Sequence, residues 1–116
     1  MLHYIESVDK YIKHGNNALN ITDDAINLVD FIKNEIKFED GTGELLDIGS
    51  GIGTLTIMLS DIKKFNKFTC VEIQEEVFKL LEENILINKM SDVDIFNKDI
   101  KDMIKEEFRY KFRYIR

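Results

Sequence analysis

A short apolar run that ends in three alternating glycines constrains the fold of this chain more than any other feature. Residues 44–53 read ELLDIGSGIG, and an amphipathic helix pattern follows them. Glycine has no Cβ, so it adopts positive φ and lets a ligand lie against the backbone at the C-terminal end of a strand. The free amides at the start of the next helix favour a carboxylate or a phosphate. The sequence therefore predicts strand, tight turn and helix, with a ligand site at the turn.

The spacing of the glycines separates the possible ligands. The dinucleotide fingerprint is G-x-G-x-x-G, and Gly49 and Gly51 fit it, but its third glycine would fall on Thr54. In this chain the third glycine is Gly53. An NAD-type oxidoreductase is therefore the least favoured interpretation, and a glycine-rich turn without a ligand is a further alternative.

The form (D/E)-x-x-D-x-G-x-G-x-G, which residues 44–53 match in full, resembles motif I of the class I S-adenosylmethionine-dependent methyltransferases. The resemblance implies an α/β fold with a Rossmann-like, doubly wound parallel sheet, and S-adenosylmethionine as the cofactor. From this motif it implies cofactor contacts at Asp47, Gly49, Ser50, Gly51 and Gly53.

A second strand is predicted over Phe68–Ile73, which is rich in β-branched and aromatic residues. With the preceding strand and helix it completes a βαβ unit. Glu72 stands at its end, 19 residues beyond Gly53. A nucleoside-binding unit has a carboxylate at this place, because its two oxygens accept both ribose hydroxyls. The alternative is a surface glutamate at the end of a strand.

Two segments also resemble the bacterial methyltransferases that modify the exocyclic amine of a tRNA adenine. Residues 71–74 (VEIQ) resemble the segment after motif I in that subgroup, and residues 21–31 resemble the segment before it. The matching residues of the earlier segment are Asp24, Ala25, Leu28 and Phe31. Asn27 departs from the pattern, because the subgroup prefers leucine there.

This resemblance adds Ile73 to the implied cofactor contacts. It also makes Thr22, Asp24 and Gln74 weaker candidates for cofactor contacts. The alternative role for these three residues is capping of a helix N-terminus. A third strand is predicted over Val93–Phe96.

The pair Asp99–Ile100 follows that third strand and resembles the adenine-recognising motif of class I methyltransferases. The resemblance implies that Asp99 accepts a hydrogen bond from the adenine amino group and that Ile100 packs on the ring. Asp99 has a structural alternative, in which it caps a helical turn over residues 100–105.

Apolar periodicity predicts helices over Met1–Lys13, Thr22–Lys37, Leu55–Ile62 and Glu75–Lys89. In residues 106–116 basic and aromatic residues alternate, as in a half-buried strand or a platform for single-stranded nucleic acid. We favour a fourth strand that lies beside the first. The expected organisation is an N-terminal helical segment, residues 1–38, and the N-terminal half of a Rossmann-like domain of about four strands, residues 39–116.

The chain contains no proline. Methyltransferases that act on amines orient the target nitrogen with Asn/Asp-Pro-Pro-Tyr/Phe, which this sequence therefore lacks. No catalytic residue is assigned, and the expectation is an N-terminal fragment or a truncated product that keeps the cofactor half. A noncatalytic interaction module, completed by strands of another chain, is the alternative from a different functional class.

Composition limits the partners. The net charge of −6 opposes binding to phosphates, so contact with tRNA requires a local patch or regions beyond these residues. The single cysteine, Cys70, excludes an internal disulfide and is expected as a small core residue. His3 and His14 have no neighbours at metal-ligand spacing, so no metal is predicted. No apolar run is long enough to span a membrane, and we expect a cytoplasmic protein.

Overall fold

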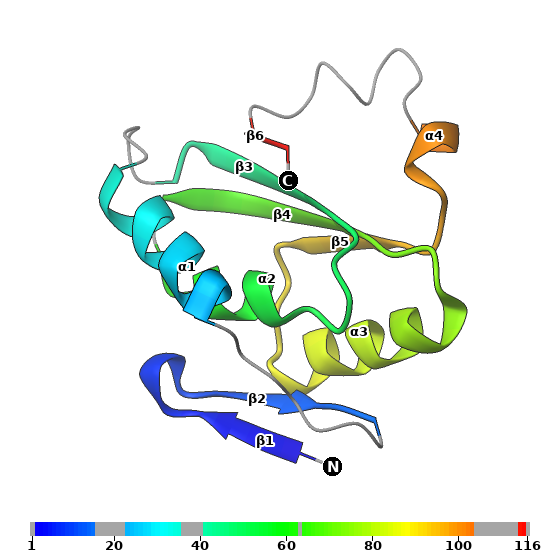
Figure 1. Cartoon of the computed structure of the whole chain (residues 1–116), viewed down its shortest axis with the longest axis horizontal. Coiled ribbons are helices and arrows are strands. Elements are labelled where there is room, and N and C mark those ends of the chain that lie inside the picture. The colour runs from blue at the N-terminus through cyan, green and yellow to red at the C-terminus, as the bar shows by residue number, and fades with distance from the viewer. Residues whose placement is uncertain (1, 16–22, 36–40, 63, 104–113, 116) are drawn as a thin grey trace.

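The computed structural model describes residues 2–15, 23–35, 41–62, 64–103 and 114–115, and it has an α/β architecture (Figure 1). In chain order its elements are β1 (Leu2–Ile5), the 3-10 turn η1 (Glu6–Val8), β2 (Lys10–Lys13), α1 (Asp23–Glu35), β3 (Gly43–Ile48), α2 (Thr54–Leu59), β4 (Phe65–Val71), α3 (Glu75–Ile87), β5 (Val93–Phe96), α4 (Ile100–Met103) and β6 (Tyr114–Ile115).

A parallel sheet in the order β5-β4-β3-β6 forms the centre of the molecule. In register, Asp47 of β3 lies opposite Cys70 of β4, and Cys70 lies opposite Ile95 of β5. The predicted fourth strand is confirmed at Tyr114–Ile115, beside β3. Because β4 and β6 flank β3 on opposite sides, the chain changes direction across the sheet at β3, which is where open α/β sheets bind ligands.

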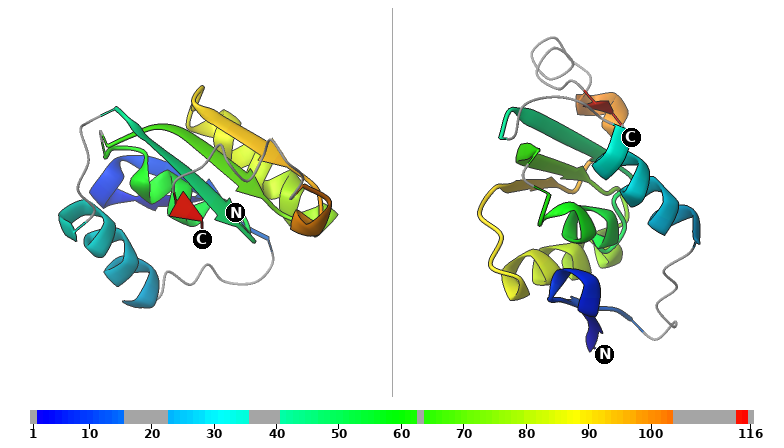
Figure 2. Two further views of the ribbon diagram at one scale, coloured as in Figure 1. Left: turned by 90° about the horizontal axis from the view of Figure 1, so that it is seen from above. Right: turned by 90° about the vertical axis from the view of Figure 1, so that its left-hand side faces the viewer.

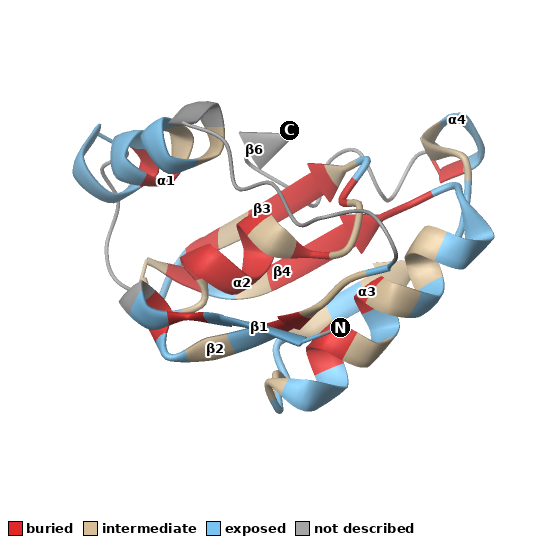
Figure 3. Cartoon of the chain, turned by 60° about the horizontal axis from the view of Figure 1, so that its bottom comes forward, coloured by how far each residue is buried: buried red, intermediate tan, exposed pale blue. Residues whose placement is uncertain are grey.

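The two faces of the sheet pack against different helices, because side chains alternate along a strand. Leu45 and Phe68 contact the largest core cluster, which includes residues of α1, α2 and the N-terminal segment. Cys70 packs with Leu81 and Ile85 of α3. On the opposite face, Leu46 and Val71 pack with Met103 of α4. Figure 3 shows the buried residues concentrated on β3, β4 and α2.

The helix predicted over Met1–Lys13 is wrong, because this segment is an antiparallel hairpin of β1 and β2. Ile5, Val8 and Ile12 are buried, so the apolar spacing of three and four residues is real. It arises because η1 interrupts the strands and Asp9 reverses the chain in the left-handed conformation, with φ 51° and ψ 49°. Ile5 and Ile12 lie in β1 and β2, where β-branched side chains are favoured, whereas Val8 lies in η1.

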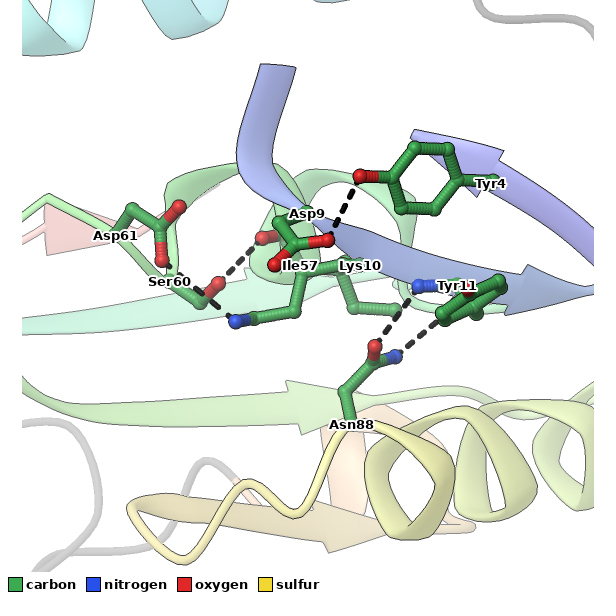
Figure 4. Close-up of polar contacts among 8 residues, drawn as sticks. All are labelled: Tyr4, Asp9, Lys10, Tyr11, Ile57, Ser60, Asp61 and Asn88. Atoms are coloured by element: carbon green, nitrogen blue, oxygen red, sulfur yellow. Dashed lines mark hydrogen bonds and ion pairs between the residues drawn. The ribbon is translucent and has the colours of Figure 1, made fainter. Parts of the chain in front are cut away.

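The hairpin packs against the helical layer and not against the sheet. Figures 1 and 2 show it on the far side of α2 and α3 from the sheet. Lys10 Nζ lies 3.7 Å from Asp61 Oδ1, just beyond α2, and the side-chain amide of Asn88 bonds the backbone of Tyr11 (Figure 4).

The other element predictions agree with the structure within a few residues. The helices predicted from Thr22 and from Glu75 are present as α1 and α3, and the third strand is present as β5. The helix after the glycines ends at Leu59, earlier than the predicted Ile62. The boundary between residues 38 and 39 stays a prediction. Within the described ranges no helix has both the length and the apolar character of a membrane span.

Candidate functional site

The glycine turn, residues 49–53, connects the end of β3 to α2. Its three glycines have positive φ, at 73° for Gly49, 59° for Gly51 and 96° for Gly53. The backbone N–H groups of Gly49 and Ser50 both donate to the carbonyl of Val71, at 2.8 and 3.0 Å. The turn is therefore fixed to the end of β4, in the conformation that the glycine spacing predicts.

Only part of the turn faces open space. A Cβ added at Gly49 or Gly51 would meet no atom within 4 Å, so a ligand has access to the backbone there. A Cβ at Gly53 would lie 2.8 Å from Leu81 Cδ1, and Leu81 is fully buried in α3. Gly53 therefore allows the turn to pack closely against α3, whereas Gly49 and Gly51 leave a surface.

Glu72 follows β4 directly and holds the turn from the side of the sheet. Its side chain is buried, its Oε1 accepts from the Gly51 N–H at 2.9 Å, and its Oε2 accepts from the Gln74 N–H at 2.9 Å. Because each carboxylate oxygen accepts two hydrogen bonds, both oxygens keep capacity for a hydroxyl donor. The predicted acid thus lies beside the open part of the glycine turn.

Asp47 and Ser50 lie beneath the turn. Asp47 is fully buried in β3. Ser50 is also buried, and its hydroxyl donates to the Asp47 carbonyl at 2.6 Å and accepts from the Val71 N–H at 3.2 Å. The side chain of Ser50 therefore joins the ends of β3 and β4.

A cavity of about 140 Å³ opens at the C-terminal ends of the strands, and we call it the strand-end cavity. Its lining residues are Ile48, Gly49, Val71, Ile73, Lys98, Asp99 and Ile100. Four residues predicted to contact the cofactor thus share one space, although they come from three separate segments. Asp47 and Glu72 do not line this cavity.

Two residues of this region were not predicted from the sequence as part of the site. Lys98 lines the cavity, with its Nζ 5.8 Å from the centre of the Phe96 ring. Asn97 donates from Nδ2 to the carbonyls of Glu72 and Ile73, at 2.9 and 3.2 Å. The signal that could have identified both is the polar triplet directly after a predicted strand, residues 97–99. Asn97 therefore fixes the backbone at Glu72 and Ile73.

The structure also tests the capping alternatives. Asp99 Oδ1 accepts from the Lys101 N–H at 2.9 Å, so Asp99 caps α4 as well as lining the cavity. Gln74 occupies the N-cap position of α3, but its side chain makes no capping hydrogen bond. Thr22 lies outside the described residues, and the side chain of Asp24 is not described either.

Cys70 is a buried core residue, as predicted. Burial raises the pKa of its thiol to about 11, and a contact of 3.2 Å between Sγ and Thr56 Oγ1 opposes that rise. Among the described residues no group of three His, Cys, Asp or Glu side chains is placed to hold a metal ion. A larger cavity of about 420 Å³ lies between the hairpin and α1, and none of the predicted site residues lines it.

The sequence is similar to known proteins. Residues 21–112 match the methyltransferase small domain family. Ribosomal RNA small subunit methyltransferase A of Fusobacterium nucleatum is 33% identical over 103 residues, which are 89% of this chain and 34% of that protein.

Solved structures share the fold. The crystal structure of M. jannaschii TYW2 in complex with AdoMet has a TM-score of 0.72 at 20% identity, over 92% of this chain and 47% of that chain. The complex of aTrm5 and tRNALeu gives a TM-score of 0.63 at 16% identity, over 87% of this chain and 28% of that chain. The chain spans less than half the length of each of these three proteins.

Proposed function

Because the chain belongs to the methyltransferase small domain family, we propose that it binds S-adenosylmethionine at the glycine turn and the strand-end cavity. When bound, this cofactor supplies the methyl group. The chain would then be the cofactor-binding part of a methyltransferase. The observation that carries the proposal is that Gly49, Ile73, Asp99 and Ile100 line one cavity at the C-terminal ends of the strands.

The chemistry of these residues suits the parts of the cofactor. The open backbone at Gly49 and Gly51 leaves room for a ligand to lie against the turn. The Glu72 carboxylate, held beside Gly51, has acceptor capacity for ribose hydroxyls. Ile73 is exposed and Ile100 partly so, and both offer apolar contact to an adenine ring beside the Asp99 carboxylate.

For the methyl acceptor we propose an adenine amino group in tRNA. The support is the resemblance of residues 21–31 and 71–74 to the tRNA adenine methyltransferases, together with similarity to proteins whose names specify ribosomal RNA and tRNA. We assign no catalytic residue within these 116 residues, since the proline-containing motif that orients an amine is absent from them. Methyl transfer is proposed for a protein in which further segments supply that motif.

Isothermal titration calorimetry of the full chain with S-adenosylmethionine and with NAD tests the proposal. We expect binding of S-adenosylmethionine only. Glu72→Gln should weaken it by roughly tenfold or more, because hydrogen bonds to a charged acceptor are lost. Glu82→Gln, on the exposed face of α3, is the matched control and should leave the affinity unchanged. Absence of S-adenosylmethionine binding, or tighter binding of NAD, would contradict the proposal.

A further inference from the structure

One buried side-chain amide in α3 joins the N-terminal hairpin to the glycine turn. Asn84 is fully buried, and its Oδ1 accepts from the Lys13 N–H at 2.5 Å. Its Nδ2 donates to the carbonyl of Lys13 and to the carbonyl of Ile52, each at 2.9 Å. Both N–H groups of the amide are therefore used, and its orientation is fixed by partners on two separate segments.

The contact with Ile52 lies inside the glycine turn. Ile52 stands between Gly51 and Gly53, and Gly53 directly precedes the start of α2. Glu72 holds the N–H of Gly51 from the side of the sheet, while Asn84 holds the carbonyl of Ile52 from the side of α3. Two neighbouring residues of the turn are thus fixed from opposite sides. Of these two contacts, the one from Asn84 connects the turn to the hairpin.

Asn88 provides a natural comparison one helical turn further along α3. Its Oδ1 accepts from the Tyr11 N–H at 2.9 Å, and its Nδ2 donates to the Tyr11 carbonyl at 2.7 Å (Figure 4). Residues four apart on a helix share a face, and residues two apart on a strand share an edge. Asn84 and Asn88 therefore bond the edge of β2 in the same way, but none of the hydrogen bonds of Asn88 reaches the glycine turn.

We propose that Asn84 is a positioning residue through which the docked hairpin holds the glycine turn in its cofactor-binding conformation. The inference rests on the proposed function for the identity of the ligand, S-adenosylmethionine. The bonds to Lys13 fix the plane of the amide, and the remaining N–H group then points at the Ile52 carbonyl. A turn that is already ordered loses less conformational entropy when a ligand binds. The hairpin thus contributes to affinity without touching the cofactor site.

The test compares Asn84→Asp with Asn88→Asp in the full chain by calorimetry with S-adenosylmethionine. Each change keeps an acceptor for the hairpin N–H and removes the side-chain donors, but only Asn84→Asp disconnects the turn. We expect Asn84→Asp to lower the affinity roughly tenfold, because the buried hydrogen bond to the Ile52 carbonyl is lost. Asn88→Asp should lower the affinity less than about twofold. Asn84→Ser removes the amide without adding a charge and should also weaken binding.

The pH dependence of the affinity in Asn84→Asp offers a second readout. A purely structural role of Asn84 would not change it. A buried carboxyl group has a raised pKa, and its neutral form carries one O–H donor. Lowering the pH should therefore restore affinity in Asn84→Asp relative to the wild type at the same pH. Asn84→Ser should show no such recovery.

Hydrogen exchange of the Gly53 amide, which bonds the Ser50 carbonyl at 3.1 Å, tests the bracing without a ligand. It should be faster in Asn84→Asp than in Asn88→Asp. Equal affinities of the wild type and both Asn84 variants, or an equal loss in Asn88→Asp, would overturn the inference. Failure of the wild type to bind S-adenosylmethionine would instead overturn the proposed function, and the exchange rates would still decide whether Asn84 braces the turn.

Discussion

At the scale of single residues, the three glycines of the turn have similar backbone angles but different surroundings. All three adopt the left-handed region that favours glycine, which costs an L-residue roughly 1–2 kcal/mol. Only Gly53 also lies against a fully buried side chain, that of Leu81. The backbone conformation therefore requires glycine at positions 49 and 51. At position 53, both the backbone conformation and the close packing against α3 require it.

Gly53→Ala should accordingly destabilise the protein more than an alanine at another left-handed glycine. We expect a loss of about 2–4 kcal/mol in the free energy of unfolding, from backbone strain together with overpacking against Leu81. Gly41→Ala is the control, because Gly41 has φ 76° and open space around its missing Cβ, and it should lose only about 1–2 kcal/mol. Urea denaturation measures both, and equal losses would show that Leu81 moves aside without cost.

Cys70 gives a prediction about pH. Burial raises the pKa of its thiol from about 9 to about 11, so the folded protein keeps a proton that the unfolded chain releases in that range. Stability is therefore unaffected by this group below about pH 8 and falls as the pH rises from about 9 to about 11, by roughly 2–3 kcal/mol in total.

The variant Cys70→Ala should lose this part of the pH dependence, because it has no thiol to ionise. The measurement is the free energy of unfolding at several pH values between 7 and 11, expressed as the difference between wild type and variant so that other titrating groups cancel. That difference should shrink above about pH 9. A constant difference across the range would mean that the folded protein does not disfavour the thiolate.

The position of Glu72 was predictable from its distance to the glycines, because βαβ units have a regular length. Its bond to Gly51 was not, because it depends on the register of β3 against β4, which spacing alone does not determine. Asn84 did leave a signal. It is a polar residue on the apolar face of α3, between Leu81 and Ile85, and a buried amide there requires partners that only the tertiary structure supplies.

At the scale of elements, the long segments were predictable and the hairpin was not. Helices α1 and α3 each have 13 residues, enough turns for the apolar stripe to repeat, and β3 and β4 have six and seven residues, most of them buried. The hairpin strands have four residues each, with a 3-10 turn between them that imitates helical spacing. Periodicity cannot separate these two cases over so few residues.

The helix α3 performs two tasks, and its apolar stripe reveals only the first. Leu81 and Ile85 pack beneath β4, as the stripe predicts. Asn84 and Asn88, on the hairpin side of α3, take the place of a neighbouring strand for β2. Because unpaired backbone groups at a strand edge need hydrogen-bond partners, these two amides explain how a short two-stranded sheet is stable beside a helix.

At the scale of the whole molecule, the hairpin lies outside the residues that match the family, 21–112, yet it contributes to the main core. Ile5, Val8 and Ile12 belong to the same cluster as Leu45 and Phe68 of the central sheet. The hairpin is also bonded to α3 through Asn84 and Asn88. The largest core cluster therefore reaches without a break from the hairpin through α2 to one face of the sheet.

This continuity predicts that a core change in the hairpin weakens the whole protein. Ile12 has no exposed surface, so Ile12→Ala should lower the free energy of unfolding by about 2–5 kcal/mol. Leu2→Ala is the matched control, because Leu2 is 56% exposed on the adjoining strand, and its effect should stay within about 0.5 kcal/mol.

Urea unfolding is to be followed by circular dichroism at the helices and by NMR at the hairpin amides. If the core is one cooperative unit, the two probes shift together in Ile12→Ala. Loss of the hairpin signals with an unchanged helical transition would show instead that the hairpin unfolds separately. The sheet and its helices would then not depend on the hairpin for stability.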